Sequence, residues 1–429
     1  MTPSVATSLP VTDPVMPRLD RWGLAATVSG NALEFYDFIA YSTFAVYIGR
    51  NFFPAADALA SLLLSLATFG IGFLTRPLGA LLIGAYADRA GRRPALLLTI
   101  GLMTSGTVAL VLTPSYARIG LAAPIILALA RLVQGVALGG EVGASTALLL
   151  EAAPMGRRGR FVSWQGASQG AAVLAAGLFG FGLSLLLTAE QMGDWGWRVP
   201  FALGLAIVPV GLYVRRRLPE TLLVRGSRGG GAVLLLLWRQ QRRQLLLAML
   251  ILMSLTISTY VNNYMTTYAL TSLGMPASQA LFATIVNGLM MLAGSVLAGR
   301  LADHFGCRAV MVLPRVALIL LICPAFLLLV KFPRPFELMT VTALVTAISS
   351  LSGTAALTTI TSAFPSEVRS CGLAVAYAAA VSLFGSTTQL IVAWLIGTTG
   401  DRLAPAYYVI ATSIVGLWAM LRLPQDSGN

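Results

Sequence analysis

Two carboxylates stand inside an apolar run that is long enough to cross a membrane. The run contains the stretch Gly30–Tyr41, GNALEFYDFIAY, with its acids at Glu34 and Asp37. A carboxylate at bilayer depth is costly unless it faces a protein interior or a watery cavity, so such an acid is a functional candidate. Asn31, Glu34 and Asp37 follow one another at three-residue spacing, which places them on one helix face. This polar stripe indicates a helix that lines a polar path. The alternative is that both acids are paired structural residues.

Arg131 lies in another apolar run, at about the same predicted depth as Glu34 and Asp37, given a helical rise of about 1.5 Å per residue. An arginine beside acids forms a pair that a proton or a substrate anion could open. Proton and anion would then each be accommodated better when the other is present. Glu34 and Asp37 are therefore proton-coupling candidates and Arg131 is a substrate-binding candidate. A permanent structural ion pair remains the alternative.

Two more charged residues, Arg76 and Glu141, fall at similar depths nearer one end of their runs. Arg76 could bind a carboxylate, because a planar guanidinium suits a carboxylate bidentately, or it could pair with Glu141, which would then act as a gate. Arg315 is expected to snorkel toward the headgroups. The uncharged candidates for substrate binding are Asn31, Gln165, Gln169, Asn263 and Tyr264. Each of them could instead form a hydrogen bond between helices.

The composition excludes most soluble classes. The chain is 57% hydrophobic and 10% charged, whereas soluble domains carry about 25% charged residues. Its net charge of +13 comes from arginines that cluster in the loops between apolar runs, which is a topology signal and not a nucleic-acid footprint. With a single histidine and no CxxC spacing, we expect no metal site and no cofactor. No G-x-S-x-G elbow or nucleotide-binding loop is present, so we expect neither an enzyme nor ATP drive.

An all-α integral membrane protein with twelve transmembrane helices follows from the apolar runs, because about 20 apolar residues span a bilayer. The predicted helices are 22–47, 57–84, 93–113, 121–151, 159–188, 197–215, 243–271, 278–301, 308–330, 336–362, 368–397 and 403–423.

The arginine bias places the even-numbered connections and both termini in the cytoplasm. We therefore predict a disordered cytoplasmic tail (residues 1–21), a six-helix half (22–215), a cytoplasmic linker (216–242) and a second six-helix half (243–429). An internal repeat supports the two halves: the segment 84–93 recurs 215 residues later at 299–308, with Gly, Asp, Gly and a basic residue in register. Parallel repeats of this kind are known in secondary transporters.

The segment 84–93 resembles the G-x-x-x-D-R-x-G-R-R signature of the major facilitator superfamily. The resemblance implies that this loop is a conformational latch and not a substrate site. It assigns gating roles to Asp88, Arg89, Gly91 and Arg92, and to Asp303 in the second copy. His304 and Cys307 replace basic residues of the first copy, so we expect the second latch to be weaker.

Within the superfamily, the chain is similar to the metabolite–proton symporters. The matching segments are GNALEFYDF at 30–38, RPLG at 76–79, RLVQG at 131–135 and GGEVG at 139–143. SWQGASQ at 163–169 and DWGWRVPF at 194–201 look most like the citrate and tricarballylate branch.

The resemblance implies a monomer in the bacterial cytoplasmic (inner) membrane that imports a citrate- or tricarballylate-like carboxylate with protons by alternating access. Its partners would be that small molecule, protons and the lipid bilayer. Symport of 2-oxoglutarate, shikimate or a betaine-type solute stays open, as do efflux by proton antiport and a transporter-like sensor.

Overall fold

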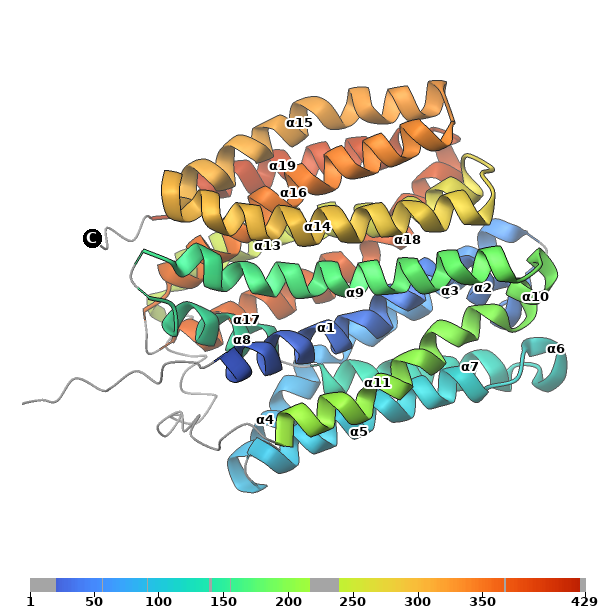
Figure 1. Cartoon of the computed structure of the whole chain (residues 1–429), viewed down its shortest axis with the longest axis horizontal. Coiled ribbons are helices and arrows are strands. Elements are labelled where there is room, and N and C mark those ends of the chain that lie inside the picture. The colour runs from blue at the N-terminus through green and yellow to red at the C-terminus, as the bar shows by residue number, and fades with distance from the viewer. Residues whose placement is uncertain are drawn as a thin grey trace, which may run out of the picture.

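A computed structural model describes residues 21–55, 57–90, 92–138, 141–154, 156–216, 239–365 and 368–424. Every regular element in these ranges is a helix, and the long helices run side by side (Figure 1). Eight helical segments in this part of the chain are long and apolar enough to cross a membrane, and Leu97–Leu112 and Ala122–Ala137 are shorter apolar helices. The predicted all-α membrane architecture is therefore confirmed.

The first half contains three predicted spans that the structure divides into two helices each. The helices are α1 (Arg21–Thr43), α2 (Ala45–Phe52), α3 (Ala58–Leu74), α4 (Arg76–Ala90), α5 (Arg92–Leu112), α6 (Tyr116–Ile119), α7 (Ala122–Ala137), α8 (Glu141–Glu151), α9 (Arg158–Leu186), α10 (Ala189–Asp194), the 3₁₀ turn η1 (Gly196–Arg198) and α11 (Val199–Arg216). The division between α3 and α4 has a local cause: Pro77 lacks a backbone N–H and is tolerated only in the first turn of a helix.

In the second half, most of the predicted spans are single unbroken helices. Its helices are α13 (Arg242–Thr271), α14 (Ala277–Phe305), α15 (Cys307–Lys331), α16 (Pro335–Ala363), α17 (Arg369–Ala380), the π-helical turn η2 (Val381–Gly385), α18 (Ser386–Thr399) and α19 (Ala404–Arg422). The predicted tail lies outside the described residues except for Arg21, and so does most of the predicted linker. The four domain boundaries stay predictions.

The two halves pack along α9 and α14, which lie side by side over most of their length (Figure 1). Glycines permit this close approach. A Cβ on Gly170 would come within 2.4 Å of the Leu292 backbone nitrogen, and a Cβ on Gly288 within 2.2 Å of that of Leu174. Small residues let membrane helices approach backbone to backbone, so this helix pair forms a tight seam between the halves.

A second seam joins α3 to the π-helical turn and α18. The hydroxyl of Ser382, in the turn, donates a hydrogen bond of 2.8 Å to the carbonyl of Phe73, near the end of α3. Irregular backbone at membrane depth is tolerated where protein buries it, and π-helical turns occur frequently at functional sites. The turn lies close to Arg76, since Phe73 is three residues before it.

Arg315 does not reach the headgroups, so the snorkelling prediction was wrong. Its side chain is 0% exposed. The guanidinium donates from Nη1 to Ser258 at 2.9 Å and to Ser413 at 3.3 Å, and from Nε to Ser352 at 3.3 Å. These hydroxyls belong to α13, α19 and α16, which surround α15 and hold the cation inside the second half.

Candidate functional site

The Asp37–Arg131 cluster joins α1, α5 and α7 inside the first half. The Arg131 Nη1 and Asp37 Oδ2 atoms are 3.0 Å apart, and the two side chains are 0% and 9% exposed. The Gln134 side chain donates to the same Asp37 oxygen at 2.9 Å, and the Thr107 hydroxyl donates to Asp37 Oδ1 at 2.9 Å. The pairing expected from depth is present. The carboxylate accepts three donors, so its buried oxygens are satisfied by hydrogen bonds.

The Arg131 guanidinium has hydrogen-bond donors that the cluster does not use. It lies over the Tyr41 ring, 4.0 Å from the ring centroid, and Nη1 also donates to the Gln134 side-chain oxygen at 2.8 Å. Its Nε and Nη2 atoms are buried without a hydrogen-bond partner. Unused buried donors are costly, so this cation would gain from a further acceptor that reached it. Gln134 and Thr107 were missed by the sequence reasoning, although Gln134 stands three residues after Arg131 in RLVQG.

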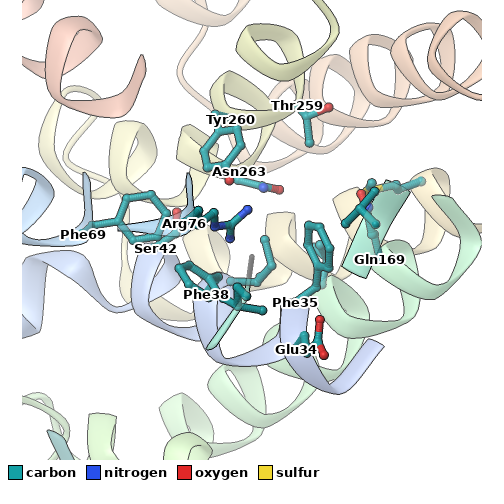
Figure 2. A pocket seen from close by; sticks show the side chains of 15 residues that line it. Glu34, Phe35, Phe38, Ser42, Phe69, Arg76, Gln169, Thr259, Tyr260 and Asn263 are labelled. Atoms are coloured by element: carbon teal, nitrogen blue, oxygen red, sulfur yellow. The ribbon is translucent and has the colours of Figure 1, made fainter. Parts of the chain in front are cut away.

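A central cavity lies on another side of α1, between the two halves (Figure 2). First-half helices contribute Glu34, Phe38, Ser42, Phe69, Arg76 and Gln169, and α13 contributes Thr259, Tyr260 and Asn263. The space open to water is about 30 Å³, which is room for one or two water molecules. A solute larger than that requires the halves to separate around the cavity.

Arg76 provides the cavity with a buried cation. Its guanidinium carbon lies 4.3 Å from the centroid of the Phe73 ring and 4.9 Å from that of Phe38. Its Nε atom is buried without an acceptor. Figure 2 shows the guanidinium projecting between Phe38 on one side and Tyr260 with Asn263 on the other. Glu34 lines the same cavity, close enough for its charge to act on Arg76.

Four of the predicted uncharged candidates divide into two groups. Gln169 and Asn263 line the cavity, and the Asn263 side-chain oxygen accepts a 2.9 Å hydrogen bond from Asn287. Asn31 and Gln165 bind each other instead, with the Gln165 amide donating to the Asn31 oxygen at 2.9 Å. Neither of these two is among the residues that line the cavity, so their polar groups join α1 to α9.

Tyr264, the fifth uncharged candidate, is buried in the apolar core of the second half and is likewise absent from the cavity wall. The cavity's aromatic character was not anticipated. The Tyr260 ring lies 6.1 Å from Phe69 and 5.8 Å from Phe73, centroid to centroid. Phe38 stands within the GNALEFYDF segment, so the sequence already contained one sign of an aromatic cavity wall.

One end of the bundle, which we call the linker end, is where α11 ends and α13 begins; two ionic contacts join the halves there. Asp303, at the end of α14, accepts from the backbone nitrogens of Gly159 at 2.7 Å and Arg160 at 3.3 Å, and the Arg160 Nε lies 3.4 Å away. A carboxylate at the N-terminus of a helix, here α9, is favourable. Arg369 pairs with Glu151 at 3.2 Å. These contacts join the two halves at the linker end, and a gating role for Asp303 stays a prediction.

The other predicted gating residues cannot be placed in this way. Gly91 lies outside the described residues, and so do the side chains of Asp88, Arg89, Arg92 and Glu141. Their gating roles stay predictions.

Residues 27–387 match the family model of the Major Facilitator Superfamily. The chain belongs to this superfamily. It is 36% identical over 402 residues to the citrate-proton symporter of Klebsiella pneumoniae, covering 93% of this chain and 90% of that one. It is 32% identical over 412 residues to the proline/betaine transporter of Escherichia coli (strain K12), covering 92% of this chain and 82% of that one.

Among solved structures, the xylose transporter XylE from E. coli in a partially occluded inward open conformation aligns with a TM-score of 0.73 at 18% identity. The alignment covers 95% of this chain and 98% of XylE. The major facilitator fold and the family resemblance are therefore confirmed. The superfamily consists of membrane transporters, so this chain is a transporter and not an enzyme.

Proposed function

We propose that this transporter is a proton symporter that imports a citrate-like di- or tricarboxylate across the bacterial cytoplasmic membrane. The observation that carries the proposal is Arg76, a buried cation in the central cavity between the halves, with an unused Nε donor. The identity of 36% with a citrate-proton symporter over nearly the whole chain supports the same substrate class.

The cavity has suitable chemistry for a polycarboxylate. One substrate carboxylate would bind the Arg76 guanidinium, exchanging a cation–π contact for a bidentate ion pair. Amide and hydroxyl groups of Gln169, Asn263 and Ser42 surround the same space and would donate to the remaining carboxylates and hydroxyl. Because the cavity now has space for only one or two waters, substrate would bind after the halves have moved apart.

The proton would bind at Asp37. Protonation removes the negative charge that holds Arg131 Nη1, Gln134 and Thr107 in place, and a protonated carboxyl offers one donor where the cluster now supplies only donors. The cluster would therefore rearrange when Asp37 is protonated. Such a rearrangement in α1, which also lines the substrate cavity, makes the affinity for substrate depend on the proton, and the reverse dependence follows by linkage.

A betaine-type solute is the second candidate, and a specific observation favours it. The rings of Phe38, Phe69 and Tyr260 line the cavity, and Phe73 packs against Phe38 and Tyr260. Aromatic faces attract quaternary ammonium groups. Arg76 would bind the carboxylate of such a zwitterion. A relative at 32% identity is a proline/betaine transporter.

The decisive experiment is uptake of radiolabelled citrate into proteoliposomes with an inward proton gradient, with tricarballylate, 2-oxoglutarate, shikimate and glycine betaine as unlabelled competitors. We expect gradient-dependent uptake that tricarballylate inhibits. Arg76→Lys should raise the apparent KM for citrate at least tenfold, because lysine lacks the planar fork, whereas the exposed Arg118→Lys should leave it unchanged. Inhibition by glycine betaine without citrate uptake would establish the second candidate. Uptake at the same rate with and without the proton gradient would refute symport.

A further inference from the structure

A second cavity, which we call the threonine cavity, lies between α1, α5 and α11 and reaches Asp37 from a side that the central cavity does not touch. It has about 70 Å³ of space for water, enough for several molecules. Its polar wall consists of Glu34 and Asp37 from α1 and Thr99, Thr104 and Thr107 from α5. Asp37 lines this cavity and is absent from the wall of the central one.

The threonine cavity extends from Asp37 toward the linker end. Thr107 binds Asp37 directly, and Thr99 stands eight residues earlier in α5, about 12 Å nearer the start of that helix. α1 and α5 both begin at the linker end, and α11 ends there (Figure 1). On α11, the cavity is lined by Gly204, Leu205 and Val208, and this direction along α11 likewise leads toward the linker end.

Within the threonine cavity, Asp37 and Glu34 are the acids. The residues that α5 and α11 contribute are threonine, glycine and apolar side chains without any ionisable group. The other charged or titratable groups close to Asp37 are Arg131 from α7, Tyr36, whose hydroxyl is held by the Pro200 carbonyl at 2.8 Å, and Tyr41, whose hydroxyl is held by the Ser65 carbonyl at 3.1 Å. Threonine hydroxyls both donate and accept, so they can hold a file of water along the cavity.

We infer that the threonine cavity is the route by which the proton leaves Asp37 toward the linker end, apart from the substrate. The inference rests on the proposed symport and adds the route. Substrate occupies the central cavity between the halves, whereas the proton travels within the first half, behind α1. Glu34 lines both cavities. Proton release therefore does not have to wait for substrate to clear the central cavity.

The test blocks the threonine cavity without touching Asp37 or the central cavity. Thr104→Val removes a hydroxyl at nearly constant shape, and Leu205→Phe adds volume to the wall formed by α11. Ser105→Ala is the matched control, because Ser105 is the exposed neighbour of Thr104 on α5 and does not line the cavity. Proteoliposomes would report proton-driven uptake of radiolabelled citrate, release of protons inside by a trapped pH dye, and citrate counterflow, which needs no net proton movement.

We expect Thr104→Val with Leu205→Phe to slow proton-driven uptake and internal acidification at least tenfold and to leave counterflow within twofold of the unaltered protein. Ser105→Ala should change neither. Full proton-driven uptake in the double variant would overturn the route while leaving symport intact, and equal loss of uptake and counterflow would overturn it as well. A lack of proton dependence in the unaltered protein would refute the proposed function itself, so the two failures are distinguishable.

Discussion

Removing Arg131 should destabilise the protein strongly, and removing its partner as well should restore most of the loss. Arg131→Met takes away a cation that is 0% exposed and leaves the Asp37 carboxylate buried with only Gln134 and Thr107 as donors. For charge centres about 4 Å apart in an effective dielectric of about 20, the lost attraction is about 4 kcal/mol. Breaking one side of a buried ion pair typically costs about 3–5 kcal/mol.

The double variant Arg131→Met with Asp37→Asn contains neither charge. Its asparagine oxygen can still accept from Thr107. We expect the free energy of unfolding of the double variant to lie within about 1–2 kcal/mol of that of the unaltered protein, because replacing a buried ion pair by neutral groups often changes stability little. Asp37→Asn alone leaves the Arg131 cation buried without its carboxylate, and it should also cost about 3–5 kcal/mol. The coupling energy between the two sites should therefore be at least about 4 kcal/mol.

The assay is reversible denaturant unfolding of the detergent-solubilised protein, followed by tryptophan fluorescence for all four members of the cycle. Arg315→Met is the matched control, since it removes an equally buried arginine that donates to the hydroxyls of Ser258, Ser352 and Ser413. It should cost clearly less than Arg131→Met. Additive single effects at Asp37 and Arg131, with a coupling below about 0.5 kcal/mol, would refute the reasoning.

Two further predictions concern the contacts between the halves. Gly288→Ala should destabilise the protein by about 1–3 kcal/mol, because its new Cβ meets the Leu174 backbone at 2.2 Å; the same assay should find Gly101→Ala, which meets nothing within 4 Å, neutral or slightly stabilising. Asp303→Asn should cost about 1 kcal/mol through the lost charge at the start of α9. It should also increase the reactivity toward a water-soluble maleimide of a cysteine placed at Ser163, which lies one turn further along α9 and is buried. Unchanged labelling would show that Asp303 does not close the linker end.

The bilayer explains why the sequence predicted the helices well. Its thickness fixes how long an apolar run must be, so the predicted span 278–301 lies within α14 (Ala277–Phe305) and 336–362 within α16 (Pro335–Ala363). Helix breaks depend on local chemistry instead. The division between α3 and α4 was not predicted, since 57–84 was expected as one helix, although Pro77 explains it. The π-helical turn at Val381–Gly385 has no proline within it and no comparable sequence signal.

The depth of a polar side chain along its helix could be predicted from the sequence, but the side of the helix on which it points could not. Counting residues placed Arg131 level with Asp37, and the two side chains do meet. The same counting could not tell that Asn31 and Gln165 bind each other between α1 and α9, since polar residues of membrane helices serve cavities and helix contacts alike. Arg315 was misplaced for the same reason, because its distance from the helix end said nothing about which face it occupies.

The two arginines that are 0% exposed, Arg131 and Arg315, indicate where proton coupling can reside. Arg131 faces a carboxylate, so a proton can change the net charge of its cluster. Arg315 faces hydroxyls, and those of Ser258 and Ser352 already donate to backbone carbonyls at 2.8 Å. Among the described residues, a proton can thus alter the first cluster, whereas the hydrogen-bond partners of Arg315 include no carboxylate that could accept one. α1 contributes Asp37 to that first cluster and Glu34, one turn away, to both cavities. A helix that both ligands bias is the physical basis for coupling between sites, so substitutions that stiffen or displace α1 should uncouple the proton from the substrate more than equivalent changes in α15.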